Sequence, residues 1–183
     1  MMRTKLKDML VTYMPTHTEY TFKTEMLSFI EQHPNCFERS LAVGHITASS
    51  WLINHDNTSA LLMHHAKLDR WLQLGGHCDG DPDVLAVAIK EAQEESGLTE
   101  IVPVSTEIFD IDIHLIPDTP KEKAHYHYDV RFLLQATKKD EPVIVNSESK
   151  SLVWISKDTS SIEFFKDNLS VVRLFNKWLL HSI

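Results

Sequence analysis

A glycine-opened loop that leads into an acidic helix constrains this 183-residue chain more than any other feature. Gly75 and Gly76 open the loop, and apolar residues then recur at helical spacing. Asp81 suits the N-cap of this helix, with Pro82 in the first helical position. Gly97 suits the left-handed residue that ends a helix. The window therefore predicts a loop followed by a helix with defined ends.

Three glutamates lie on one edge of this predicted helix. Glu91, Glu94 and Glu95 are spaced i, i+3 and i+4, so their side chains project together from one turn. Their mutual repulsion is unfavourable, and the helix macrodipole near the C-terminus disfavours anions further. A hard divalent cation would offset both effects. An ordinary solvated acidic face is the alternative, but the glycine loop at this spacing favours the metal site.

The window from Gly75 to Leu98 resembles the signature of the Nudix hydrolases. Counted from the glycine that opens the family pattern, Gly76, five later positions fall in register: Glu91, Glu94, Glu95, Gly97 and Leu98. The sequence departs from the pattern at Pro82, where the family has its first glutamate, and at Lys90, where it has arginine. Lys90 lacks the planar, two-pronged donor set of arginine, which bears on how the ligand carboxylates are supported.

This resemblance implies an α+β fold in which a mixed β-sheet is sandwiched between helices. It also implies that Glu91, Glu94 and Glu95 bind Mg²⁺ or Mn²⁺, with Glu94 and Glu95 the expected indispensable pair. The implied reaction is hydrolysis of a diphosphate linkage in a nucleoside diphosphate derivative or a related small molecule. Family members often draw a general base from a glutamate on a later loop, and Glu148 resembles that position, with Glu141 as the less favoured substitute.

Two other functions remain open. A Nudix-like domain that senses a ligand without catalysis is favoured by the departures at Pro82 and Lys90. An isomerase of an allylic diphosphate uses a related fold, but the catalytic cysteine and acid arrangement that it needs are not identifiable here. Cys78 is disfavoured as a nucleophile because it has no evident base partner.

A strand with alternating histidines forms the second candidate site. His125, His127 and Asp129 occupy alternate positions and therefore share one face, as Arg131 does. We expect this face to line a pocket, in which His125, His127 and Arg131 contact the substrate together with Gly76 and His77 of the glycine loop. A transition metal bound by His125, His127 and Asp129 is the competing hypothesis, but the sequence offers no further fixed ligand.

Composition narrows the partners and the compartment. The net charge of −8 and the pI near 5.7 argue against binding to a nucleic-acid polymer. Cys36 and Cys78 are the only cysteines, and no signal-like or membrane-spanning stretch is found. We therefore expect a cytoplasmic protein with free thiols and no membrane partner. A homodimer is the default oligomeric state.

Periodicity suggests how the chain is organised. We expect an N-terminal helical extension at residues 1–35, a Nudix domain at residues 36–158, and C-terminal helices packed on the same domain at residues 159–183. Alternation is clearest over Phe109–Leu115 and His125–Leu134, which predict paired strands with one apolar face. The other expected strands are 41–53, 60–64, 71–74, 143–145 and 152–155.

Overall fold

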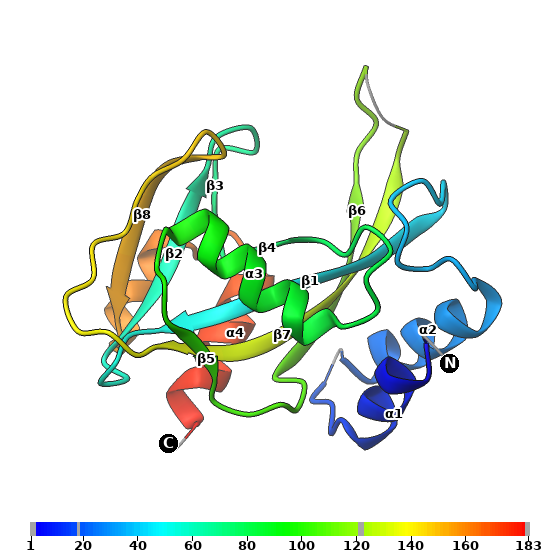
Figure 1. Cartoon of the computed structure of the whole chain (residues 1–183), viewed down its shortest axis with the longest axis horizontal. Helices are drawn as coiled ribbons and strands as arrows, with labels where there is room; N and C mark the ends of the chain where they lie inside the picture. Colours follow the sequence, from blue (N-terminus) through cyan, green and yellow to red (C-terminus); the bar gives the residue numbers. More distant parts are fainter. Residues whose placement is uncertain (1–2, 18, 121–122, 182–183) are drawn as a thin grey trace. The chain divides into compact units, whose positions relative to one another are not determined.

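A computed structural model describes residues 3–17, 19–120 and 123–181 of the chain (Figure 1). The chain divides into two compact units. The first unit comprises Met1–Ser49, Gly76–Ala88 and Thr106–Phe132, and the second comprises Ser50–Gly75, Ile89–Ser105 and Leu133–Ile183. Each unit is described by itself below.

Within the described residues, the strands form an eight-stranded sheet. Five strands are hydrogen-bonded in the order β3-β2-β1-β7-β5. The other three pair with members of this row: β4 with β1, β6 with β7 and β8 with β2. The strands are β1 (Gly44–Ile53), β2 (Ser59–His65), β3 (Arg70–Leu72), β4 (Leu74–His77), β5 (Ile101–Pro103), β6 (Asp110–Ile116), β7 (His125–Ala136) and β8 (Ser149–Ser156). The helices are α1 (Thr4–Thr12), α2 (Glu19–Gln32), α3 (Val84–Ser96), the 3₁₀ helix η1 (Thr159–Phe164) and α4 (Leu169–Leu180). This arrangement confirms the predicted α+β class.

The two N-terminal helices of the first unit are amphipathic, as the sequence predicts. α1 and α2 lie side by side, and α2 also packs against β6 (Figure 1). Leu6, Leu10, Met26 and Ile30 are fully buried between these elements. Burial of such aliphatic side chains supplies about 1.5–3 kcal/mol each, which explains why the short helices are stable in this context.

The β6–β7 hairpin of the first unit has the predicted alternation, but its polar face is not solvated. Its antiparallel register pairs Asp110 with Arg131 and Asp112 with Asp129. All four of these side chains are buried. Apolar residues on the opposite face are buried near the open end of the hairpin, as Ile111 and Val130 are, and exposed toward its tip, as Leu115 and Tyr126 are. Both faces of the hairpin are therefore covered near its open end, which the alternating pattern alone did not predict.

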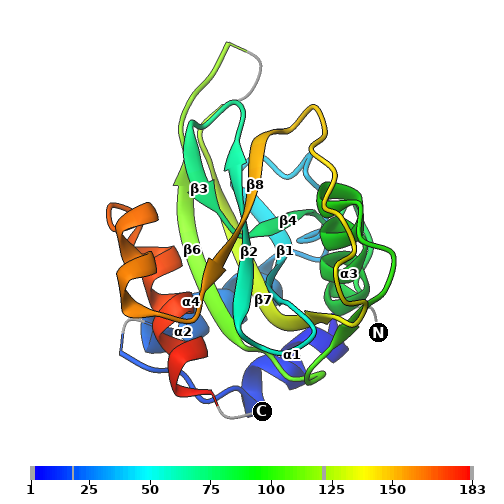
Figure 2. The same cartoon turned by 90° about the vertical axis from the view of Figure 1, so that its left-hand side faces the viewer.

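The C-terminal helix α4 belongs to the second unit (Figure 2). Its apolar stripe packs within that unit, where Phe175 and Trp178 contact the ring of Trp51 in β1. The indole Nε1 of Trp178 also donates a 2.7 Å hydrogen bond to the side chain of Asn57. The structure thus accounts for this stripe without a second subunit.

The acidic helix α3 begins two residues later than predicted. The Asp83 carbonyl accepts a 3.0 Å hydrogen bond from the Val87 N–H, and its carboxylate accepts one of 3.4 Å from the Ala86 N–H. Asp83 is therefore the N-cap, and Asp81 instead closes a turn by accepting from the Asp83 N–H at 2.9 Å. The C-terminal prediction is confirmed, because Gly97 has a φ of 74°.

One predicted strand is absent from the described residues, and one strand escaped prediction. Residues 143–145 lie outside the sheet, because the Ile144 N–H donates at 2.7 Å to the Ser96 carbonyl at the end of α3. The strand that was not predicted is the short β5, which pairs with the last residues of β7. The segment after β7 thus follows the end of α3 instead of forming a sheet ladder.

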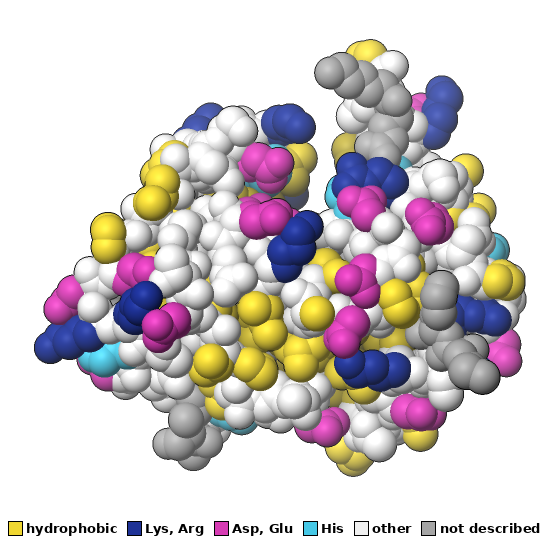
Figure 3. Space-filling view, viewed as in Figure 1, with side chains coloured by type: hydrophobic (Ala, Val, Ile, Leu, Met, Phe, Trp, Pro, Cys, Tyr) yellow, Lys and Arg dark blue, Asp and Glu magenta, His cyan; other side chains and the backbone are white. Residues whose placement is uncertain are grey.

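The surface is mixed in charge on the face that Figure 3 displays. Lysine and arginine side chains alternate there with aspartate and glutamate and do not gather into one basic patch. This distribution agrees with the acidic composition. Among the described residues, no helix combines the length and the apolar character that crossing a bilayer requires.

Candidate functional site

Glu95 is the buried member of the three helix carboxylates. Its side chain is 4% exposed, and its Oε2 accepts a 2.8 Å hydrogen bond from the N–H of Gly75. Burial raises the pKa of Glu95 to about 8, with further increases from the charges of Glu91, Glu148 and Glu94, and the Gly75 N–H opposes these effects. The ionised carboxylate is therefore costly here unless a cation accompanies it.

The other two helix carboxylates are more accessible. Glu94 is exposed and lies 3.6 Å from the ammonium of Lys90, one turn earlier on α3, and Glu91 is half-buried. The helix carries all three on one edge, and each carboxylate is a hard oxygen donor. This donor set fits Mg²⁺ or Mn²⁺.

The structure holds Glu148 near the same helix. Its backbone N–H donates to the side chain of Asn146 at 2.9 Å, and the Asn146 amide donates to the Glu94 carbonyl at 3.2 Å. The Glu148 carbonyl also accepts a 2.8 Å hydrogen bond from the Ala66 N–H. The exposed carboxylate of Glu148 is thus carried by a turn tethered to α3, close enough for its charge to act on Glu95.

The alternative base, Glu141, is engaged elsewhere. Its carboxylate accepts hydrogen bonds from the Thr99 hydroxyl at 2.7 Å and from the Thr99 N–H at 3.2 Å. The hydroxyl hydrogen bond lowers the pKa of Glu141. A carboxylate held in this way is less available to act as a general base.

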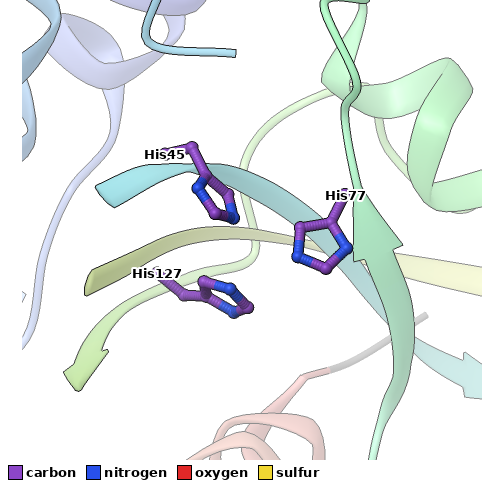
Figure 4. Close-up of side chains that lie close together, drawn as sticks. All are labelled: His45, His77 and His127. Atoms are coloured by element: carbon purple, nitrogen blue, oxygen red, sulfur yellow. The ribbon is translucent and has the colours of Figure 1, made fainter. Parts of the chain in front are cut away.

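A cluster of histidines lies in the first unit. His45 at the start of β1, His77 at the end of β4 and His127 in β7 direct their rings toward one another (Figure 4). Each offers one ring nitrogen, and these atoms lie within 4.8 Å of one another. His125 adjoins the group, with its Nε2 3.3 Å from the Nε2 of His127. His45 was not predicted from the sequence, because no local spacing links it to the other histidines.

Burial disfavours protonation of two of these histidines, His45 and His127. His45 is 0% exposed, and burial lowers its pKa to about 4. Burial also lowers the pKa of His127 to about 2. His127, which the sequence predicts to contact the substrate, is therefore disfavoured as a positively charged contact. His77 and His125 remain predicted substrate contacts, as Gly76 of β4 does.

Arg131 lies in a buried ion network. Its guanidinium is bound by Asp129 at 2.7 Å, by Asp110 at 3.1 Å and by Asp112 at 3.3 Å, and the residue is 1% exposed. Since these aspartates engage its donors, we propose that Arg131 positions the hairpin instead of contacting a substrate phosphate.

The same network changes the interpretation of Asp129. Its two carboxylate oxygens accept hydrogen bonds from Thr47 at 3.0 Å and Ser49 at 2.8 Å, both on β1. The competing hypothesis of a metal bound by His125, His127 and Asp129 therefore does not fit the structure, which instead brings together histidines from three strands. Cys78 is buried, and burial raises the pKa of its thiol. Both observations agree with the sequence argument against a cysteine nucleophile.

Comparison with known proteins identifies the class. No protein-family profile and no curated protein match the sequence. A NUDIX-family hydrolase from Clostridium perfringens has a similar structure, with 25% identity, a TM-score of 0.51, and coverage of 74% of this chain and 97% of its own. The MutT protein from Methanosarcina mazei Go1 is 17% identical with a TM-score of 0.55, and covers 75% of this chain and 94% of its own. The dihydroneopterin triphosphate pyrophosphohydrolase of E. coli is 11% identical with a TM-score of 0.55, and covers 75% and 96%.

The fold is thus that of the Nudix hydrolases. Glu91, Glu94 and Glu95 lie on the helix that follows the glycine loop, as the signature requires. The structural similarity to these hydrolases confirms the resemblance that the sequence predicts.

Proposed function

We propose that this protein is a metal-dependent hydrolase that cleaves the diphosphate linkage of a nucleoside diphosphate derivative or a related small molecule. The observation that carries the proposal is the buried carboxylate of Glu95, held by the Gly75 N–H beside the acidic edge of α3. The structures with a similar fold include a hydrolase and a pyrophosphohydrolase, which supports the same class of reaction.

Glu91, Glu94 and Glu95 are the proposed ligands for Mg²⁺, with Mn²⁺ as a substitute. A cation bound there supplies charge neutralisation for the diphosphate and activation of the attacking water. The chain itself supplies the orientation. The Gly75 N–H fixes Glu95, and the rigid helix sets its distance from Glu94 and Glu91.

Glu148 is the proposed general base. Its exposed carboxylate is free of the hydroxyl contact that engages Glu141, and its turn is tethered to α3 through Asn146. In this role Glu148 would accept a proton from the attacking water, which requires an accessible carboxylate within reach of that water.

A ligand-sensing domain without catalysis is the second candidate. The observation that favours it is the ion pair between Lys90 and Glu94, in which an ammonium competes with a cation for a proposed ligand. Binding of a nucleotide without turnover would support this alternative.

Incubation of the pure protein with Mg²⁺ and a panel of dinucleotides, nucleotide sugars and nucleoside triphosphates tests the proposal. We expect release of phosphate-containing products that chelation abolishes and that Glu94→Gln reduces by about 100-fold or more. Glu163→Gln is the matched control, because Glu163 is also an exposed glutamate paired with a lysine, Lys166, at 2.9 Å. Equal turnover by parent and Glu94→Gln would refute the assignment.

We also propose domain boundaries at residues 35 and 158, a cytoplasmic location, a homodimer, and substrate contacts at Gly76, His77, His125 and His127. Size-exclusion chromatography with light scattering addresses the dimer.

A further inference from the structure

We propose that His45, His77 and His127 form a binding site for a divalent transition metal of borderline softness, of which Zn²⁺ is the representative ion. These imidazole donors are distinct from the carboxylates of α3. The site would therefore be selective for a different class of ion from the Mg²⁺ of the proposed hydrolase.

The positions of the three histidines favour a metal site. Three strands, β1, β4 and β7, each contribute one histidine, and the three potential ligand nitrogens lie within 4.8 Å of one another (Figure 4). Zinc–nitrogen bonds of about 2.0–2.1 Å in a tetrahedral site place such nitrogens roughly 3.4 Å apart. Small rotations of the three rings would close this difference. Three protein ligands and one open position are a common arrangement for zinc.

Within the described part of the chain, the ring nitrogens of His45 lack hydrogen-bond partners, which also favours a metal ligand at this position. Its ring is fully buried, and among the described residues neither Nδ1 nor Nε2 has a hydrogen-bond partner. A buried polar group without a partner costs about 1–3 kcal/mol. The ring nevertheless faces two other imidazoles, with centroids 5.0 Å from His77 and 4.8 Å from His127. A metal bond would satisfy one of its nitrogens.

The hydrogen-bonded neighbours of His127 also suit a metal-bound ring. The Lys123 carbonyl can only accept, so the His125 Nδ1, 2.8 Å away, donates to it. The other nitrogen of His125, Nε2, lies 3.3 Å from the Nε2 of His127, and where His125 accepts in this contact the Nε2 of His127 carries the hydrogen. The Nδ1 lone pair of His127 is left for a cation. A ligand ring that donates its other N–H to a neighbour is the usual support of a metal-bound histidine.

Zinc titration of the full chain tests the site. The chelator-treated protein is titrated with ZnCl₂ by calorimetry in excess Mg²⁺, which occupies the carboxylates. We expect one zinc per chain, and binding about 100-fold weaker in His77→Asn and in His127→Asn. His17→Asn is the matched control, because His17 is an exposed histidine with a positive φ that asparagine also tolerates.

Two further readouts separate this proposal from a folding defect and from the hydrolase. Circular dichroism establishes that each variant is folded, and zinc should raise the melting temperature of the parent but not of His77→Asn. Cobalt substitution should give the intense visible bands of a tetrahedral site in the parent but not in His77→Asn. Glu94→Gln should bind zinc as the parent does. Absence of zinc binding, undiminished binding by His77→Asn, or its loss in Glu94→Gln would each overturn the proposal.

Discussion

The N–H of Gly75 donates a 2.8 Å hydrogen bond to the carboxylate of Glu95, twenty residues later in the chain. This bond joins strand β4, at the glycine pair that precedes the loop, directly to the acidic end of α3. It explains why the signature needs both parts, because a carboxylate this deeply buried requires a donor to fix it. A side chain fixed in this way is prepared to bind a cation.

Substitution of Glu95 by glutamine should separate activity from stability. The amide oxygen can still accept from Gly75, but the charge that holds a cation is lost, so we expect turnover to fall by about 100-fold or more. Steady-state assays at saturating Mg²⁺ measure this loss. Turnover within threefold of the parent would exclude Glu95 from the metal site.

The stability of the same variant should depend on pH when metal is removed by chelation. Burial raises the pKa of Glu95 from 4.5 to about 8 in the folded state. The folded state then binds more protons than the unfolded state between these values, so the stability of the parent falls as the pH rises from 4.5 to 8. Glu95→Gln lacks this loss. Urea unfolding should give equal stabilities at pH 4 and a more stable variant at pH 9.

Glu148 and Glu141 should differ in their effect on catalysis. We expect Glu148→Gln to slow turnover by more than about tenfold, because a general base contributes at least this much. Glu141→Gln should leave turnover nearly unchanged, since its carboxylate is occupied by Thr99. Comparison of kcat for the two variants is the measurement, and a larger effect of Glu141→Gln would reverse the assignment.

Removal of the buried guanidinium should destabilise the first unit. Arg131→Met leaves Asp110, Asp112 and Asp129 without their shared cation, and breaking such a buried pair costs about 3–5 kcal/mol. Lys123→Gln is the control, because its 3.7 Å pair with Asp118 is exposed and contributes little. The free energy of unfolding in urea measures both. A cost below 1 kcal/mol for Arg131→Met would contradict a structural role.

Both cysteines should resist thiol reagents in the folded protein. Burial raises the pKa of Cys36 to about 11, so about one thiol in a thousand is ionised at pH 8. Burial also raises the pKa of Cys78, and neither sulfur is accessible. We expect slow modification by iodoacetamide under native conditions and rapid modification of both in denaturant, measured by mass spectrometry. Rapid native modification of Cys78 would reopen a role for its thiol.

Features set by local spacing could be predicted from the sequence. The positions of Glu91, Glu94 and Glu95 on one turn depend only on helical periodicity, and Gly97 ends α3 because glycine adopts a positive φ without strain. The alternation of β6 and β7 was equally readable, because side chains in a strand repeat every two residues.

The tertiary structure alone decided which side chains meet and which are buried. Arg131 was expected to face substrate, but its partners Asp110 and Asp112 come from another strand, and burial is a property of the packed fold. His45 joins His77 and His127 only because three strands bring together residues more than thirty positions apart. The sequence determined the local chemistry of each segment, and the fold determined its partners, because long-range contacts leave no periodic trace in the chain.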